Sequence, residues 1–113
     1  VNNNRHWCGD HSQWTVFVCS RSRDGMHPTQ KPVELGVKAI SNHNGRSVMD
    51  FFLGSGSTLI ACQKTGRKCF GMEIDPHYCD VIITRWSDFT GKDDLLLNGK
   101  PFKWSERKMK KAA

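Results

Sequence analysis

Hydrophobic and polar positions along the chain predict a central succession of strand, loop, helix, strand and helix. Residues 47–52 and 68–74 are apolar runs bounded by turn residues, which is typical of buried strands. Residues 58–64 lie between them with apolar positions at helical spacing, and a second helix is expected from Asp75-Pro76 to Trp86. Parallel strands connected by a helix indicate α/β architecture.

Three further segments extend this central unit. Residues 15–19 form a β-branched and aromatic run that predicts a strand. A helix is expected to begin near Pro32, where a first-turn proline is tolerated, and to end at residues 42–45. The residues after Phe89 are polar and basic, with Leu95-Leu96-Leu97 as an apolar patch. We therefore expect an α/β fold of about three strands with flanking helices.

The length of 113 residues and the apolar fraction of 37% indicate one folded domain over residues 1–113. No apolar run is long enough to span a bilayer, and the polar N-terminus has no secretory core segment. We therefore expect a cytoplasmic protein without membrane association. The chain begins with Val1 rather than Met, which suggests a part of something longer or removal of the Met by processing.

The net charge of +6 is partly concentrated at the C-terminus. Residues 100–113 contain six cations and one acid, and we expect them to form a basic, mobile tail. Two interpretations stay open for this tail: a solvated surface, or a weak contact with the phosphate backbone of a nucleic acid.

The cysteines indicate a reduced chain. Their number is five, which is odd, and none has Cys-x-x-Cys spacing. His6, Cys8, His11 and Cys19 could in principle hold zinc, but their spacing matches no common zinc module. We therefore expect no metal site.

A glycine-containing loop follows the first buried strand. Because it leaves a parallel strand and enters a helix, it lies at the carboxyl edge of the sheet, where ligands bind. Gly54 and Gly56 let a ligand approach the backbone closely, and the helix N-terminus adds unpaired N–H groups. Glu73 ends the next strand, 17 residues after Gly56. An acid there can accept hydrogen bonds from both ribose hydroxyls, or serve only as a charge at a helix N-terminus.

Phosphate ligands are disfavoured at this loop. The chain contains no Gly-x-x-x-x-Gly-Lys-Ser/Thr string, and a dinucleotide fingerprint would need glycine where Leu59 stands. The loop alone could be a plain tight turn. The loop and Glu73 together favour a nucleoside ligand without a pyrophosphate.

Three ordered blocks resemble the C-terminal part of bacterial and phage DNA amino-methyltransferases. They are residues 27–35 (HPTQKPVEL), 50–58 (DFFLGSGST) and 71–78 (GMEIDPHY), and the resemblance covers about residues 12–92. The blocks look most like the permuted β class, which uses S-adenosylmethionine to modify adenine N6 or cytosine N4. One departure is Phe51, which stands where that family usually has proline and implies a local backbone adjustment.

The resemblance implies a partial Rossmann-like methyltransferase fold and a site for S-adenosylmethionine. The first block would lie against the methionine end of the cofactor and the second would form the cofactor loop. Glu73 would hold the ribose and Ile74 would pack on adenine. The implied cofactor-binding residues are Thr29, Lys31, Pro32, Asp50, Phe52, Gly54, Ser55, Gly56, Ser57, Thr58, Glu73 and Ile74.

The family's catalytic element is Asp, Asn or Ser followed by Pro-Pro and an aromatic residue, which stacks on the flipped base. No such string occurs in the 113 residues. Residues 75–78 (DPHY) look similar, but they directly follow Glu73 at a helix start. Asp75 is better interpreted as the N-cap and Pro76 as the first helical residue. We therefore expect no catalytic residues and no methyltransferase activity of this chain alone.

Three hypotheses for the function follow, and the absent phosphate loop argues against one of them, a nucleotide-binding domain of another class. The first is the S-adenosylmethionine-binding portion of a DNA N6-adenine or N4-cytosine methyltransferase, which acts on DNA as part of a full-length enzyme. The alternative is a non-enzymatic remnant that folds, oligomerises and binds nucleic acid through its basic tail. A three-stranded remnant leaves apolar edges uncovered, so we also expect a homodimer or a swapped assembly.

Overall fold

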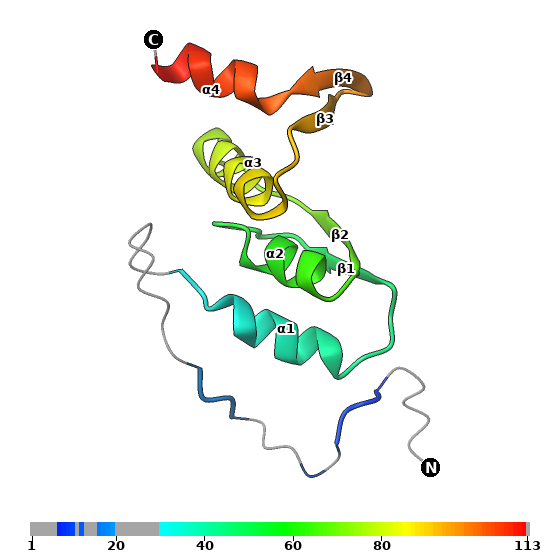
Figure 1. Ribbon diagram of the computed structural model, residues 1–113. Helices are drawn as coiled ribbons and strands as arrows, with labels where there is room; N and C mark the ends of the chain where they lie inside the picture. The colour runs from blue at the N-terminus through cyan, green and yellow to red at the C-terminus, as the bar shows by residue number, and fades with distance from the viewer. Residues whose placement is uncertain (1–6, 11, 13–15, 20–29, 113) are drawn as a thin grey trace.

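The computed structural model describes residues 7–10, 12, 16–19 and 30–112 (Figure 1). The elements, in chain order, are α1 (Val33–Ser41), β1 (Ser47–Asp50), α2 (Ser57–Lys64), β2 (Lys68–Gly71), α3 (Pro76–Thr90), β3 (Asp94–Leu97), β4 (Lys100–Lys103) and α4 (Trp104–Ala112). The predicted succession of strand, loop, helix, strand and helix is confirmed over residues 47–90.

β1 and β2 form a parallel two-stranded sheet, and α2 is the connection between them. Their register aligns Val48 with Cys69 and Met49 with Phe70. α2 packs on one face of this sheet, where the Cys69 thiol contacts that of Cys62 in α2. Side chains alternate between the two faces of a strand, so Met49 and Phe70 lie on the opposite face, and both are exposed.

The hydrophobic core lies between α1 and α2, which run side by side in Figure 1. Its centre is formed by Val33, Ile60 and Ala61, and Val37, Ile40 and Trp86 pack around it. Glycine is needed at position 36 because a Cβ there would lie 2.9 Å from the Cβ of Ala61. The absence of a side chain therefore lets the two helices approach closely.

α3 begins where the sequence predicts its cap and ends later than the sequence predicts. The Asp75 side chain accepts a hydrogen bond from the backbone N–H of His77 at 2.8 Å, and Pro76 occupies the first turn. This confirms Asp75 as the N-cap. The helix continues one turn beyond the predicted end at Trp86 and ends at Thr90, where Gly91 adopts the left-handed conformation.

The C-terminal residues form a hairpin and a helix where the sequence predicts only a polar and basic segment with an apolar patch. β3 and β4 are antiparallel, and the two-residue turn between them has positive φ angles of 52° at Asn98 and 78° at Gly99. Asn-Gly is the preferred pair for such a turn, so this dipeptide was the available signal for the hairpin. Trp104 begins α4 and is only 4% exposed, which attaches the helix to the rest of the fold. The expected mobility of residues 100–113 stays a prediction.

The predicted strand at residues 15–19 is wrong for the part that the structure describes. Val16–Cys19 has no regular secondary structure, and among the described residues β1 and β2 pair only with each other. A run of β-branched residues supplies strand propensity, but a strand needs a neighbouring backbone to pair with. The Phe17 ring instead lies 4.6 Å from the Lys38 ammonium of α1.

Of the segments that the structure describes, none is a helix long and apolar enough to cross a membrane.

Candidate cofactor site

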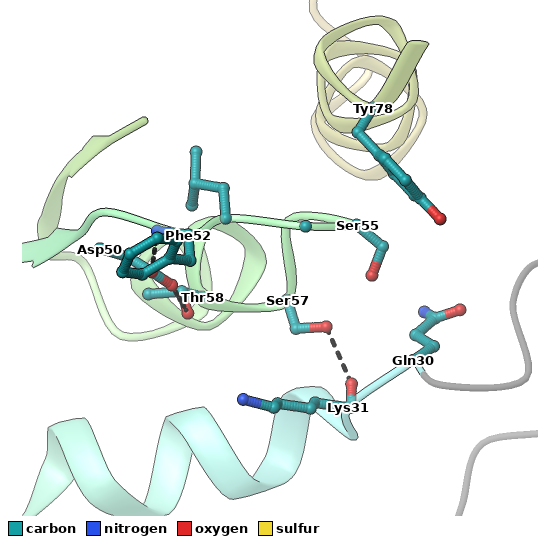
Figure 2. Close-up of a pocket in the computed structure, with 10 residues that line it drawn as sticks. Gln30, Lys31, Asp50, Phe52, Ser55, Ser57, Thr58 and Tyr78 are labelled. Carbon is teal, nitrogen blue, oxygen red and sulfur yellow. Dashed lines mark hydrogen bonds between the residues drawn. The ribbon is translucent and has the colours of Figure 1, made fainter. Parts of the chain in front are cut away.

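A cavity of about 320 Å³ opens at the carboxyl end of β1. Figure 2 shows Asp50, Phe52 and Thr58 at one end of the cavity, and Gln30, Ser55 and Tyr78 at the other. A hydrogen bond joins Ser57 to Lys31 between these two ends. The full lining comprises Gln30, Lys31, Asp50, Phe52, Leu53, Gly54, Ser55, Ser57, Thr58 and Tyr78. Segments from three parts of the sequence therefore meet here: the residues before α1, the glycine loop and α3.

Asp50 stabilises the glycine loop by hydrogen bonds to two of its neighbours. Its Oδ1 accepts the backbone N–H of Phe52 at 2.9 Å, and its Oδ2 accepts the hydroxyl of Thr58 at 2.6 Å. The carboxylate therefore joins the end of β1 to the first turn of α2. Asp50 is partly buried, and both of its oxygens are already engaged. Its contribution to ligand binding is to hold the loop in shape.

Glu73 connects the end of β2 to the same loop. Its Oε2 accepts the backbone N–H of Gly54 at 2.8 Å, and its Oε1 accepts the backbone N–H of Asp75 at 3.0 Å. Each carboxylate oxygen has two lone-pair directions, so Glu73 keeps acceptor capacity for a ligand hydroxyl. The acid and the glycine loop, predicted to act together, are therefore in direct contact.

The two loop glycines have different roles. Gly54 has a φ of +54°, and no atom lies within 4 Å of the position that its Cβ would occupy. Gly54 thus leaves open space beside the backbone. Gly56 is buried, has a φ of +82° and caps α2, and a Cβ there would lie 3.1 Å from the side chain of Ile82 in α3. Gly56 therefore allows the close packing of α2 against α3.

The residues implied by the family resemblance, apart from Thr29, fall into three groups in the structure. One group lines the cavity: Lys31, Asp50, Phe52, Gly54, Ser55, Ser57 and Thr58. Pro32 and Gly56 cap α1 and α2 beside it. Glu73 and Ile74 line a separate cavity instead. Thr29 lies outside the residues that the structure describes.

The separate cavity has a volume of about 420 Å³ and lies between α3 and the C-terminal hairpin. Glu73, Ile74 and Pro76 form its edge near the sheet, and its other walls are mostly apolar. The Ile74 side chain is 97% exposed. The Gly54–Glu73 hydrogen bond therefore lies between the two cavities, because Gly54 lines one and Glu73 lines the other.

Four residues at the first cavity are missing from the predicted set. Gln30, Leu53 and Tyr78 line it. Arg85 donates hydrogen bonds from Nη1 to the Ser55 carbonyl at 3.1 Å and the Ser57 hydroxyl at 3.4 Å. Tyr78 and Arg85 are seven positions apart on α3, so they share one face of the helix. That spacing was the signal that could have found them.

Two cysteines near the sheet, Cys62 and Cys69, are partly or fully buried, and burial makes their thiols unreactive. Burial is the main cause that raises the pKa of Cys62 to about 12, and burial also raises the pKa of Cys69. A thiol with a raised pKa is a poor nucleophile and a poor metal ligand. Of the four residues of the zinc alternative, His6 and His11 lie outside the described part of the chain. Within the described part, no group of three or more potential metal ligands occurs.

Several cations of the C-terminal segment are paired with acids. Arg107 binds Asp80 through two hydrogen bonds, of 2.9 Å and 3.1 Å. The remaining pairs are Lys103 with Asp94 at 2.9 Å and Lys108 with Asp88 at 2.8 Å. These cations contribute less to a free positive surface than the sequence suggests.

Comparisons with known proteins agree with one another. The family described as DNA methylase, the N6 and N4 methyltransferases, matches residues 2–84. The chain is 35% identical over 83 residues to the type II methyltransferase M.HpaI of Haemophilus parainfluenzae. These matched residues cover 71% of this chain and 26% of M.HpaI. It is 40% identical over 62 residues to M.ScaI of Streptomyces caespitosus, covering 52% of this chain and 20% of M.ScaI.

A solved structure with a similar fold is the crystal structure of the complex of M1.HpyAVI with SAM. The likeness has a TM-score of 0.60 at 28% identity and covers 71% of this chain and 42% of M1.HpyAVI. It confirms the predicted Rossmann-like α/β fold. The chain spans between a fifth and about a quarter of the length of the two curated relatives.

Proposed function

Because the chain belongs to the DNA methylase family of N6 and N4 methyltransferases, we propose that it is the S-adenosylmethionine-binding portion of such an enzyme. The observation that carries this proposal is the hydrogen bond from Gly54 to the Glu73 carboxylate. It joins the glycine loop to an acid at the carboxyl edge of a parallel sheet, which is where α/β proteins bind nucleosides. M1.HpyAVI, which resembles this chain, was crystallised with SAM.

The residues present fit the cofactor. We assign the methionine end of S-adenosylmethionine to the cavity at Lys31, Asp50 and Ser55, whose volume of about 320 Å³ falls in the range of small-molecule sites, roughly 300–1,000 Å³. Glu73 would accept hydrogen bonds from the ribose, and Ile74 would cover the adenine. Open space beside Gly54 leaves room for the ligand to cross between the two cavities.

When bound, S-adenosylmethionine supplies the methyl group for transfer. The chain's own residues bind and orient the cofactor, because the string that holds the target base in this family does not occur in the 113 residues. We therefore propose that transfer to adenine N6 or cytosine N4 of DNA requires a polypeptide segment that carries that string. We also propose that the chain belongs to the permuted β class, that it is located in the cytoplasm and that residues 1–113 form a single domain.

Isothermal titration calorimetry of the purified chain with S-adenosylhomocysteine and with S-adenosylmethionine tests the proposal. We expect binding of both with one site per chain. ATP and NAD serve as controls because each contains adenosine but carries phosphates, for which the loop has no binding motif. Absence of binding of both methyl-donor ligands, or equal binding of ATP, would overturn the proposal.

The alternative is a module that binds nucleic acid through its basic C-terminal segment. The pairing of Lys103, Arg107 and Lys108 with acids reduces the charge available for phosphate contacts. DNA binding that falls steeply with salt, together with no affinity for S-adenosylhomocysteine, would favour this alternative.

We also propose that the chain self-associates through the uncovered face of its sheet. Met49, Phe51, Phe70 and Met72 are between 55% and 64% exposed on or next to β1 and β2. Parallel sheets are normally covered on both faces, so this apolar surface favours contact with another polypeptide. A second copy of the chain can bury the same residues across a two-fold axis, as a homodimer or a swapped assembly.

A further inference from the structure

We propose that Arg85 is a positioning residue that holds the glycine loop and the segment before α1 together at the cofactor cavity. This inference rests on the proposed function, because it assigns a role in the binding of S-adenosylmethionine. Arg85 lies on α3, which contains none of the cofactor-binding residues that the family resemblance implies.

The guanidinium of Arg85 donates to both sides of the cavity. Nη1 lies 3.1 Å from the carbonyl oxygen of Ser55 and 3.4 Å from the hydroxyl oxygen of Ser57. With the Gln30 amide turned so that its oxygen faces Arg85, that oxygen accepts from Nη2 at 2.7 Å and from Nη1 at 3.1 Å. One side chain therefore links the loop to Gln30 of the first block.

A second hydrogen bond connects the glycine loop to the segment before α1. The Ser57 hydroxyl donates to the carbonyl oxygen of Lys31 at 2.8 Å, and Figure 2 shows this bond between the loop and the segment before α1. Ser57 thus accepts from Arg85 and donates to Lys31. Ser55, Ser57, Gln30 and Lys31 all line the cavity. The position of Arg85 therefore sets the distance between the two walls that would enclose the methionine end of the ligand.

Arginine suits this role for geometric reasons. Its guanidinium is planar and presents five N–H donors in a fixed fork, so it can serve several acceptors at once. The ammonium of lysine is a compact point charge on a flexible chain and would not hold three acceptors at these positions. Arg85 is partly buried, which strengthens its hydrogen bonds relative to an exposed side chain.

The first measurement is the affinity for S-adenosylhomocysteine by calorimetry. For Arg85→Met and for Arg85→Lys we expect affinity to fall by about tenfold or more, the effect of losing a hydrogen bond to a charged group. The matched control is Arg67→Met, because Arg67 also donates to two backbone carbonyls, those of His43 and Gly45, but at the opposite edge of the sheet. We expect Arg67→Met to bind within twofold of the unsubstituted chain.

A second measurement separates positioning from general stability. Gln30→Met and the double variant Gln30→Met/Arg85→Met complete a double-mutant cycle with Arg85→Met. We expect the two substitutions to be coupled in their effect on affinity, because Gln30 and Arg85 contact each other directly. All three variants should keep a cooperative urea unfolding transition, which shows that the lower affinity is not a loss of fold. Additive effects on affinity, or equal affinities of Arg85→Met and the unsubstituted chain, would overturn the inference.

Amide hydrogen exchange tests the loop without a ligand. In Arg85→Met we expect faster exchange of the Gly56 amide, which donates to the Leu53 carbonyl within the loop, and no change in Arg67→Met. Unchanged exchange would overturn the role of Arg85 in holding the loop. If the unsubstituted chain bound no S-adenosylhomocysteine, the proposed function and the cofactor role of Arg85 would both fail, and faster exchange would still support the structural contact.

Discussion

The backbone N–H of Gly54 and the carboxylate of Glu73 are joined by a hydrogen bond of 2.8 Å, although 19 residues separate them in the sequence. The bond connects the loop after β1 with the end of β2, and it lies between two cavities. Because the same carboxylate also accepts the N–H of Asp75, Glu73 organises the loop, the start of α3 and the proposed ribose position together.

Replacement of Glu73 by glutamine should weaken binding of S-adenosylhomocysteine by about tenfold or more. The amide keeps one oxygen acceptor, but its NH₂ group would face a backbone N–H of Gly54 or Asp75, and the charge is lost. Calorimetry measures the affinity. Glu106→Gln, an exposed acid in the first turn of α4, is the matched control and should bind normally. Equal affinities for the two variants would contradict the ribose role of Glu73.

Alanine at position 56 should destabilise the fold more than alanine at position 66. Both glycines have positive φ angles, of 82° and 65°, which cost an alanine roughly 1–2 kcal/mol. Only at Gly56 would the new Cβ also meet Ile82, at 3.1 Å, whereas nothing lies within 4 Å at Gly66. Urea denaturation followed by circular dichroism gives both free energies of unfolding. A loss at Gly66→Ala as large as at Gly56→Ala would show that contact with Ile82 does not matter.

Introduction of a charge on the uncovered sheet face should reduce self-association. Phe70 is 55% exposed on β2, and Phe70→Glu would place a carboxylate in the proposed contact between copies. Light scattering across a range of concentrations should show a smaller mean mass for this variant than for the unsubstituted chain. Met109→Glu changes an exposed apolar residue of α4 and should leave the mass unchanged. A monomeric unsubstituted chain at high concentration would remove the basis of the proposed assembly.

Removal of the Trp104 side chain should destabilise the packing of α4 against α3. Trp104 is buried, and its Nε1 donates to the Thr84 hydroxyl at 3.1 Å. Truncation of a buried tryptophan to alanine costs about 3–5 kcal/mol, which is a large share of the stability of a small domain. Thermal unfolding should show a lower midpoint for Trp104→Ala. Phe89→Ala removes an aromatic ring from α3 that is 48% exposed, and should cost less than half as much.

Cys62 should resist alkylation that modifies Cys8. Burial raises the pKa of Cys62 to about 12, so at pH 8 only about one thiol in ten thousand is ionised, and the thiolate is the reactive form. Cys8 is exposed. Mass spectrometry after brief treatment with iodoacetamide at pH 8 should find label on Cys8 and none on Cys62. Because the raised pKa depends on burial, labelling of Cys62 should appear in urea.

Local patterns in the sequence predicted the parts of the fold that depend on neighbouring residues. Asp75 and Pro76 start α3 as expected, since an N-cap and a first-turn proline act within one turn. The loop at Gly54 and Gly56 was predicted for the same reason. The strand predicted at residues 15–19 is wrong over the described residues 16–19, because strand propensity does not identify the partner that a strand must pair with.

The hairpin at the C-terminus was missed although its signal was present. Asn98 and Gly99 both adopt positive φ angles, and Asn-Gly between two runs is a local indication of such a turn. The basic composition of residues 100–113 suggested a tail, but composition does not report which acids lie opposite. Asp80 and Arg107 are 27 residues apart, and only folding brings them together.

The sequence by itself therefore determined the glycine loop, the acid after the second strand, the N-cap of α3 and the family, because each depends on residues close together in the chain or on ordered blocks. Only the tertiary structure decided that the predicted residues surround two cavities, that Glu73 bonds Gly54 between them, and that Arg85 reaches Ser55 from α3. The physical reason is that these contacts depend on how α2 and α3 pack around the sheet, which the spacing of residues along the chain does not specify.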